Sequence, residues 1–194
     1  MAKDAGNTRG ITLIELLIVT AIISILGIAL GFEFRDWMRN YRVESQTKEL
    51  YTDLMNARSR AMARNRFHFA DFPTATSYRV GEDTDDNYDP GSPGTNPPFT
   101  VGRDTVLPPF PKTVQYDIVW PGGTIVFDAR GIATRPAGAT LCLSYGIEAN
   151  PDYDCIVISP TRINLGKLRL RIGEAGAVCD NADDNAINGN CIGR

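Results

Sequence analysis

A single carboxylate, Glu15, interrupts an otherwise apolar run of 22 residues that extends from Ile11 to Phe32. As a helix with a rise of about 1.5 Å per residue, this run would be about 33 Å long, which is enough to cross a membrane hydrocarbon core about 30 Å thick. A carboxyl group inside such a span costs about 2.5–3.5 kcal/mol on insertion scales and is a functional residue by default. Two interpretations stay open: a protonated or interfacial glutamate, or a glutamate that pairs with a cation inside the membrane.

Cleavage of the chain after Gly10 would create such a cation, because each subunit would gain an α-ammonium group at Ile11. Glu15 of one subunit would then neutralise the Ile11 amine of the next, and each pairing would remove two poorly solvated charges. Helices staggered in this way would form a polymer with a defined axial offset.

The residues around Glu15 favour a membrane helix that is retained. Residues 11–32 have no polar stripe at helical spacing, which argues against the alternative of a buried amphipathic helix. An ordinary secretory signal peptide, the other alternative, has an apolar run of about 7–15 residues, whereas this run is longer and continues into a charged helical pattern. We therefore predict a leader peptide at residues 1–10 and a membrane-spanning assembly helix at residues 11–32.

The segment from Gly10 to Val19 reads Gly-Ile-Thr-Leu-Ile-Glu-Leu-Leu-Ile-Val and resembles the class III prepilin signal of type IV pilins and type II secretion pseudopilins. The resemblance implies that a prepilin peptidase cuts after Gly10 and methylates the new amino terminus at Ile11. The family usually has phenylalanine at that position, so Ile11 is a departure from its pattern.

Residues 33–66 contain neither proline nor glycine and are rich in good helix formers. Apolar residues at steps of three and four predict one packing face: Phe34, Met38, Tyr41, Leu50, Leu54, Ala57 and Ala61. We expect this amphipathic helix to continue the membrane helix and to dock on the globular part. The pattern Leu54-x-x-Ala57-Arg58-Ser59-x-Ala61-x-x-Arg64-Asn65 resembles the helix end of the minor pseudopilin H / FimT family.

Residues 67–194 have the periodicity of strands. Seven apolar or β-branched runs are separated by Gly, Pro, Asn and Asp: residues 67–72, 76–80, 113–120, 124–128, 139–145, 155–159 and 162–172. They predict an α+β fold in which the long N-terminal helix packs on a C-terminal antiparallel β-sheet or sandwich. The resembled family has such a sandwich, and Ile125-Val126-Phe127-Asp128-x-x-Gly131 resembles part of its strand-and-turn pattern.

All four cysteines lie in the β-rich domain: Cys142, Cys155, Cys179 and Cys191. Their separations fit no zinc signature, and an even number beyond a membrane-crossing segment favours an oxidising compartment. We predict a Cys142–Cys155 disulfide across a hairpin and a Cys179–Cys191 disulfide that closes a C-terminal loop at residues 179–191. The two other connectivities and free thiols stay open as alternatives.

The longest expected loop, residues 81–98, is rich in Asp, Pro and Gly. Its oxygen donors alternate as at the start of a calcium-binding loop: Asp83, Asp85, Asn87 and Asp89. However, Tyr88 replaces the turn glycine of that motif and Gly94 replaces its bidentate glutamate. We therefore favour a solvated surface loop and expect no cofactor, and we keep calcium as the alternative.

The chain lacks the residue pattern of an enzyme. Its single histidine, His68, excludes every site that needs two, and no glycine-rich phosphate loop follows an expected strand. We expect His68 to be a half-buried structural residue and predict that the chain is not an enzyme.

These features predict a minor pilin or pseudopilin, a structural subunit of a type IV pilus or a type II secretion pseudopilus that helps to initiate or cap filament assembly. The resemblance implies three kinds of protein partner: other pilin or pseudopilin subunits, the prepilin peptidase and assembly platform proteins. It also implies a single-pass position in the inner membrane, with the globular domain extracytoplasmic, before assembly into a periplasmic or surface filament.

Two rival hypotheses stay open. The first is a DNA-binding minor pilin, because Lys167, Arg169 and Arg171 alternate with apolar residues and could contact phosphates from one strand face. The basic motif Gly-Arg-x-Arg of some FimT-like members is not matched, since the region around Arg162 reads Thr-Arg-Ile-Asn, and the net charge of −3 argues against wholesale affinity for nucleic acid. The second rival is a membrane-anchored binding protein that never polymerises.

Overall fold

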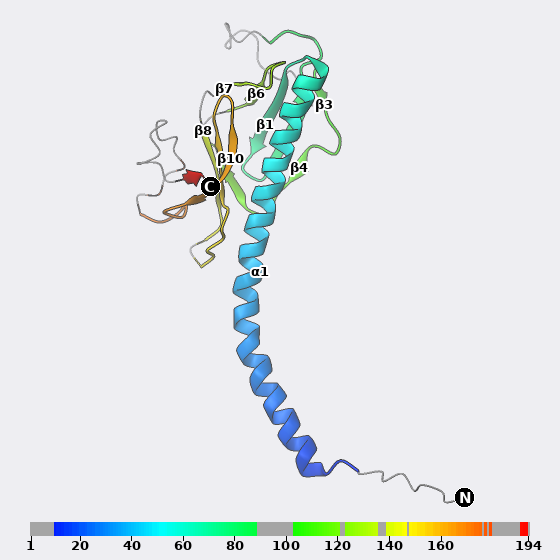
Figure 1. Ribbon diagram of the computed structural model, residues 1–194, viewed down its shortest axis with the longest axis vertical. Coiled ribbons are helices and arrows are strands. Elements are labelled where there is room, and N and C mark those ends of the chain that lie inside the picture. Colours follow the sequence, from blue (N-terminus) through cyan, green and yellow to red (C-terminus); the bar gives the residue numbers. More distant parts are fainter. Residues whose placement is uncertain are drawn as a thin grey trace, which may run out of the picture. The chain divides into compact units, whose positions relative to one another are not determined.

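The computed structural model describes residues 10–88, 103–120, 123–135, 139–146, 148–175, 177, 179 and 191–193, with only the backbone described at residues 28–33 and 135 (Figure 1). The chain divides into two compact units, one up to Met38 and one from Arg39 onward.

One long helix, α1, extends from Leu13 to Arg64 and so crosses from the first unit into the second (Figure 1). Thr12 caps its start, because the Thr12 hydroxyl oxygen accepts a hydrogen bond of 3.3 Å from the backbone N–H of Glu15. The helix ends where Asn65 adopts the left-handed conformation, with φ of 52°, and the Arg66 N–H closes back on the Ala61 carbonyl at 3.3 Å. The helix expected at residues 11–66 is confirmed to within two residues at each end.

In the first unit the described large apolar side chains of α1 are exposed: Leu13 is 81% exposed, Leu16 59% and Ile23 62%. Ile11, which precedes the helix, is 76% exposed. Among the described residues, no helix is both long enough and apolar enough to cross a membrane. The side chains of residues 28–32, at the end of the expected span, lie outside the description.

Two antiparallel sheets form the β part of the second unit. The first has the order β3-β2-β1-β6-β7, with β4 also paired to β2, and the second has the order β11-β10-β9-β8-β5. The strands are β1 (His68–Thr74), β2 (Ser77–Glu82), β3 (Thr105–Val106), β4 (Lys112–Thr113), β5 (Asp117–Val119), β6 (Ile125–Phe127), β7 (Ala133–Arg135), β8 (Ala139–Ser144), β9 (Cys155–Ile158), β10 (Ile163–Leu168) and β11 (Cys191–Gly193).

Each of the seven runs expected as strands contains a strand or part of one, which confirms the antiparallel β-rich domain. Strands β3, β7 and β11 were not expected, because two or three residues carry too little alternation to be recognised. The last expected run, residues 162–172, is too long, because β10 ends at Leu168.

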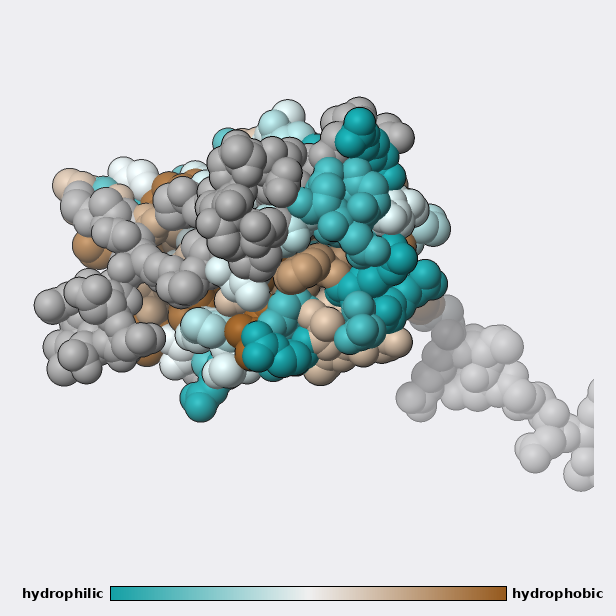
Figure 2. Space-filling view, turned by 90° about the horizontal axis from the view of Figure 1, so that it is seen from above, coloured by the Kyte–Doolittle hydropathy of each residue, from teal (hydrophilic) through white to brown (hydrophobic). Residues whose placement is uncertain are grey.

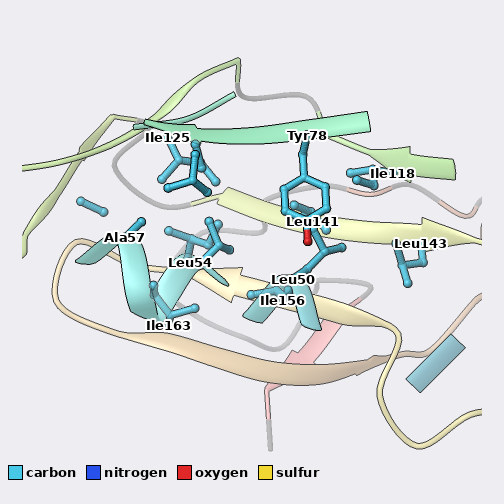
Figure 3. Packing of buried hydrophobic residues seen from close by; sticks show 14 of the residues in the cluster. Leu50, Leu54, Ala57, Tyr78, Ile118, Ile125, Leu141, Leu143, Ile156 and Ile163 are labelled. Atoms are coloured by element: carbon cyan, nitrogen blue, oxygen red, sulfur yellow. The ribbon is translucent and has the colours of Figure 1, made fainter. Parts of the chain in front are cut away.

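The core of the second unit is made by the outer half of α1 together with both sheets. Leu50, Leu54 and Ala57 of α1 are at most 2% exposed, and they meet side chains of the first and second sheets in one cluster (Figure 3). The first sheet contributes Tyr78 and Ile125 to this cluster, and the second sheet contributes Leu141, Ile156 and Ile163. The expected docking of the amphipathic helix on the β domain is therefore confirmed for Leu50, Leu54, Ala57 and Ala61. Phe34 and Tyr41, which were expected on the same face, are 57% and 58% exposed, so that part of the prediction is wrong.

Polar side chains of α1 fix the docking in register. The Gln46 side-chain amide donates to the Tyr116 carbonyl at 2.8 Å, and its oxygen accepts from the N–H groups of Gln115 and Tyr116. The Lys112 ammonium lies between Glu49 and Asp53 of the helix, at 2.8 and 2.7 Å. Because a buried amide and a partly buried lysine need these specific partners, the helix cannot rotate without leaving them unsatisfied.

The pattern Asp128-x-x-Gly131 forms a tight turn that faces α1. The Asp128 carboxylate accepts hydrogen bonds from the N–H groups of Arg130 and Ile132, at 2.9 and 2.8 Å. Burial opposes ionisation of Asp128, but these bonds and the Arg130 guanidinium outweigh it and lower its pKa. Gly131 has φ of +75°, and a Cβ there would lie 2.9 Å from the Met62 side chain, so both conformation and space favour glycine.

Candidate processing and assembly segment

Gly10 and Ile11 precede α1 and are exposed, so the bond between them lies outside regular secondary structure. A Cβ placed on Gly10 would meet nothing within 4 Å among the described residues. The predicted cleavage bond therefore lies in an accessible segment, where a peptidase could bind it in an extended form.

Glu15 lies in the first turn of α1 and is exposed. Its position three residues after Thr12 matches the capping-box pattern, a Ser or Thr at the cap followed by a Glu or Gln. A carboxylate there is also favoured by the positive end of the helix dipole. The sequence analysis did not assign a role to Thr12, although the Thr-x-x-Glu pattern ahead of an apolar run could have revealed it.

The four cysteines form two disulfides, which confirms the expected oxidised state but not the expected pairing. Cys142 is bonded to Cys179 and Cys155 to Cys191, with Cα–Cα distances of 5.8 and 6.2 Å. The predicted pairs Cys142–Cys155 and Cys179–Cys191 are therefore wrong.

The hairpin geometry behind the prediction is nevertheless present, because Cys142 of β8 lies directly opposite Cys155 of β9. Both strand cysteines are completely buried and form a small cluster with Cys179 and Cys191. Each strand cysteine therefore bonds to the chain that follows β10 instead of to the other, and the two disulfides fasten this later chain to the second sheet. The spacing of the cysteines along the sequence does not indicate that the chain after β10 returns to the second sheet.

Gly166 makes room for the second disulfide. It lies in β10, opposite Cys155 of β9 and opposite Gly193 of β11. A Cβ at Gly166 would be 2.6 Å from the Cys191 sulfur and 3.1 Å from the Cys155 sulfur. The disulfide between β9 and β11 thus passes over the intervening strand where that strand has no side chain.

The basic residues considered for DNA binding do not form the expected stripe. Lys167 lies in β10, but Arg169 and Arg171 follow the end of that strand at Leu168. The Arg171 backbone N–H donates to the Glu174 carboxylate at 3.0 Å, and their side chains lie 3.9 Å apart. The alternation on one strand face is wrong because the chain turns at residues 169–175, and Arg162 precedes the strand, after a tight turn.

Of the candidate calcium ligands, Asp83, Asp85 and Asn87 follow β2, and Asp89 lies outside the described residues. The structure places a further carboxylate, Asp104, beside Asp83 and Asp85, with ligand oxygens of all three within 4.8 Å of one another. Asp104 is 19 residues beyond Asp85 in the sequence, so only the pairing of β2 with β3 could have revealed it.

His68 is completely buried at the start of β1, and the expectation of half-burial is wrong. Its Nδ1 atom lies 3.3 Å from the Arg66 carbonyl oxygen and its Nε2 atom 3.8 Å from the Glu82 carboxylate. Burial lowers the pKa of His68, and the neighbouring Arg60 and Arg64 act in the same direction, against the Arg66 carbonyl and Glu82. His68 therefore has a structural position: its ring is packed in the interior of the domain, close to Arg60 and Arg64 near the end of α1.

A long N-terminal helix that docks its outer half on a β domain, preceded by a cleavage-type motif with a glutamate in its first turn, defines a pilin-like subunit. The sequence matches the family model described as type II transport protein GspH over residues 46–162, more than half of the chain. Residues 6–31 match the prokaryotic N-terminal methylation motif. No curated protein and no solved structure matches the chain.

The chain belongs to the GspH family of type II transport proteins and is a pseudopilin subunit of type II secretion. The family match ends at residue 162, so β10, β11 and the two cysteines that reach back to the sheet lie beyond it. Membership supports a structural rather than an enzymatic role.

Proposed function

We propose that this chain is a minor pseudopilin that helps to initiate or cap a filament, in which Glu15 of one subunit pairs with the Ile11 amine of a neighbour after removal of residues 1–10. The observation that carries the proposal is the position of Glu15 in the first turn of α1, four residues after an accessible Gly10–Ile11 bond.

The exposure of the first half of α1 supports filament assembly. Ile11, Leu13 and Leu16 have no cover within the described part of the chain, and such residues are stable only in lipid or against other helices. We propose that residues 11–32 span the inner membrane and that the same residues pack in a helical bundle after assembly. Transfer from lipid to a bundle changes apolar burial little, so helix packing and the Glu15 pairing supply the specificity.

The test compares Glu15→Ala with Thr12→Ala in the full chain. Both variants weaken the start of α1, but only Glu15→Ala removes the carboxylate, whereas Thr12→Ala removes the capping hydroxyl and costs about 1 kcal/mol of local helix stability. We expect Glu15→Ala to enter the membrane normally and to reach sheared filaments at least about tenfold less than wild type, a loss of about 1.4 kcal/mol. Thr12→Ala should incorporate close to the wild-type level.

Two outcomes contradict the pairing. Undiminished incorporation of Glu15→Ala would show that the carboxylate is dispensable, and an equal loss in both variants would assign Glu15 to helix capping alone. Mass spectrometry of the native protein gives an independent check, because a chain that still begins at Met1 offers no Ile11 amine.

Crosslinking separates the filament subunit from an anchored protein that never polymerises. One cysteine is substituted at Leu13 of this chain, and another beside the glutamate of a co-expressed pseudopilin that corresponds to Glu15. We expect the two cysteines to form a disulfide between subunits. Labelled subunits found at filament ends would support initiation or capping, whereas an even distribution along filaments would contradict that part of the proposal.

A further inference from the structure

Three acidic residues meet where β2 and β3 leave the first sheet. The register of this pair matches Gly81 with Val106 and Glu82 with Thr105, so the next pair in line is Asp83 with Asp104. Like charges placed directly opposite each other on neighbouring strands destabilise a sheet. Asp85 adds a third carboxylate, and one ligand oxygen from each residue lies within 4.8 Å of the others.

Asp83 is the buried member of this group, with only 1% of its surface exposed. Its Oδ2 atom accepts a hydrogen bond of 3.1 Å from the Tyr88 N–H, but its Oδ1 atom is buried and has no hydrogen-bond partner among the described residues. The side-chain oxygen of Asn87 is also buried and has no hydrogen-bond partner among the described residues. Buried oxygens without a donor are uncommon in folded proteins, and each one calls for a proton, a water molecule or a cation.

Hydrogen bonds from neighbouring residues hold the other two carboxylates in place. The Thr84 N–H donates to Asp104 Oδ1 at 3.0 Å, and the Asn87 side-chain amide donates to Asp85 Oδ2 at 2.9 Å. Thr84 also donates its hydroxyl to the Arg103 carbonyl at 2.7 Å, which ties the two segments together a second time. These bonds fix the carboxylates near one another.

One arginine lies beside the group, because the largely exposed Arg103 side chain is 3.9 Å from the Asp85 carboxylate. Arg66 is instead paired with Glu82 and Asp86. Seen from above, hydrophilic residues gather over one side of the domain (Figure 2). Asp85 is exposed, so a small cation could reach the group from water. Burial raises the pKa of Asp83, and the nearby carboxylates of Asp104 and Asp85 act in the same direction, against the N–H groups of Tyr88 and Asn87.

We propose that Asp83, Asp85 and Asp104, with the side-chain oxygen of Asn87, bind one calcium ion that joins the end of β2 to the start of β3. Oxygen ligands lie 2.3–2.6 Å from calcium, so two ligands of one ion are at most about 4.6–5.2 Å apart, and three carboxylate oxygens that lie within 4.8 Å of one another are compatible with one shared ion. Magnesium keeps several of its waters and is usually bound through one or two carboxylates, so a site built from three carboxylates and an amide oxygen favours calcium.

The proposed ligand set shares Asp83, Asp85 and Asn87 with the alternating pattern in the sequence and adds Asp104, which strand pairing brings beside them. Unlike the interpretation as a solvated loop, the proposal explains why Asp83 is buried with a free oxygen and opposite another carboxylate.

The experiment uses the full chain in detergent, stripped of metal by chelation. Titration calorimetry with calcium chloride alone should give one site per chain, with a dissociation constant of about 10⁻⁵–10⁻³ M, and magnesium chloride should bind at least about tenfold more weakly. Terbium, which replaces calcium, should show luminescence on excitation of tyrosine, because the Tyr88 backbone contacts Asp83.

Asp104→Asn and Asp85→Asn should each weaken calcium binding at least about tenfold. Asp86→Asn is the matched control, because Asp86 is adjacent, exposed and paired with Arg66 at 3.4 Å, and it should bind as wild type does. Circular dichroism of each variant distinguishes a lost ligand from a lost fold. Absence of calcium binding by the wild-type chain, or unchanged binding by a folded Asp104→Asn variant, would overturn the proposal.

Discussion

In the first half of α1 the described large apolar side chains are exposed, whereas in the second half one face of apolar side chains is buried. Leu13 and Ile23 are 81% and 62% exposed, but Leu50 and Leu54 are 1% and 2% exposed. Both halves belong to the same helix, so helix formation does not distinguish them. They differ in cover: both sheets of this chain cover the second half, whereas the described part of the chain leaves the large apolar side chains of the first half exposed.

The two halves of α1 also differ in the partners of their polar side chains. In the second half Gln46, Glu49 and Asp53 bind specific groups of the β domain. In the first half Thr20 and Ser24 donate to carbonyls of the preceding turn of their own helix, which satisfies a hydroxyl without any partner from outside. A helix segment that moves between lipid and protein needs polar groups that are satisfied in both environments.

Loss of either disulfide should cause the largest decrease in the free energy of unfolding. The decrease should concern the second unit alone, because both disulfides lie in it. Each disulfide closes a separation of 37 or 36 residues, for which the chain-entropy relation gives about 4 kcal/mol. Cys142→Ser with Cys179→Ser, and separately Cys155→Ser with Cys191→Ser, should each lower the free energy of unfolding by about that amount in chemical denaturation. Peptide mapping without reduction should recover Cys142 linked to Cys179, and a peptide linking Cys142 to Cys155 would contradict the observed connectivity.

A matched pair of leucine substitutions tests the comparison directly. Leu54→Ala removes a buried side chain from the cluster shared by α1 and both sheets, and it should cost about 3 kcal/mol of unfolding free energy. Leu16→Ala changes an exposed side chain, which is 59% exposed, and should cost less than about 0.5 kcal/mol. Thermal unfolding of the two variants in detergent measures the difference, and equal losses would refute the division of α1 into two halves.

A smaller effect concerns the pH dependence of the second unit. Because burial lowers the pKa of His68 below its usual value of 6.5, the unfolded chain binds more protons than the folded chain just below that pH. The stability that comes from keeping His68 neutral should therefore be fully present above about pH 6.5. Below that pH the free energy of unfolding should decrease as the pH falls toward the lowered pKa, by no more than about 1.4 kcal/mol per pH unit.

The chain has one histidine, so His68→Gln should remove this component, while the contribution of the carboxylates remains in both proteins. Denaturation curves of the two proteins between pH 5 and pH 7 measure the difference in slope. Identical slopes would show that His68 does not change protonation on unfolding.

Local patterns predicted most of the fold. The helix was found within two residues at each end, because residues 11–32 are an apolar run and residues 33–66 are good helix formers without proline or glycine. The longer strands were found because alternation over four or more residues is a strong signal, whereas β3 and β7 contain two and three residues. The N-terminal methylation motif is linear in sequence and could be recognised without the fold.

Two differences come from contact between residues distant in sequence: the disulfides pair strand cysteines with the chain beyond β10, and Asp104 reaches Asp83 only through the pairing of β2 with β3. The third is local, because Arg169 and Arg171 follow the end of β10, where the chain turns.

The sequence by itself determined the match to the N-terminal methylation motif, the long helix with one carboxylate in its apolar part and the positions of the longer strands, because each depends on neighbours along the chain. Only the tertiary structure decided which half of α1 is buried by this chain, which cysteines meet and which carboxylates face each other. Those outcomes depend on the register of two sheets against one helix, and register is set by packing over the whole domain rather than by any single segment.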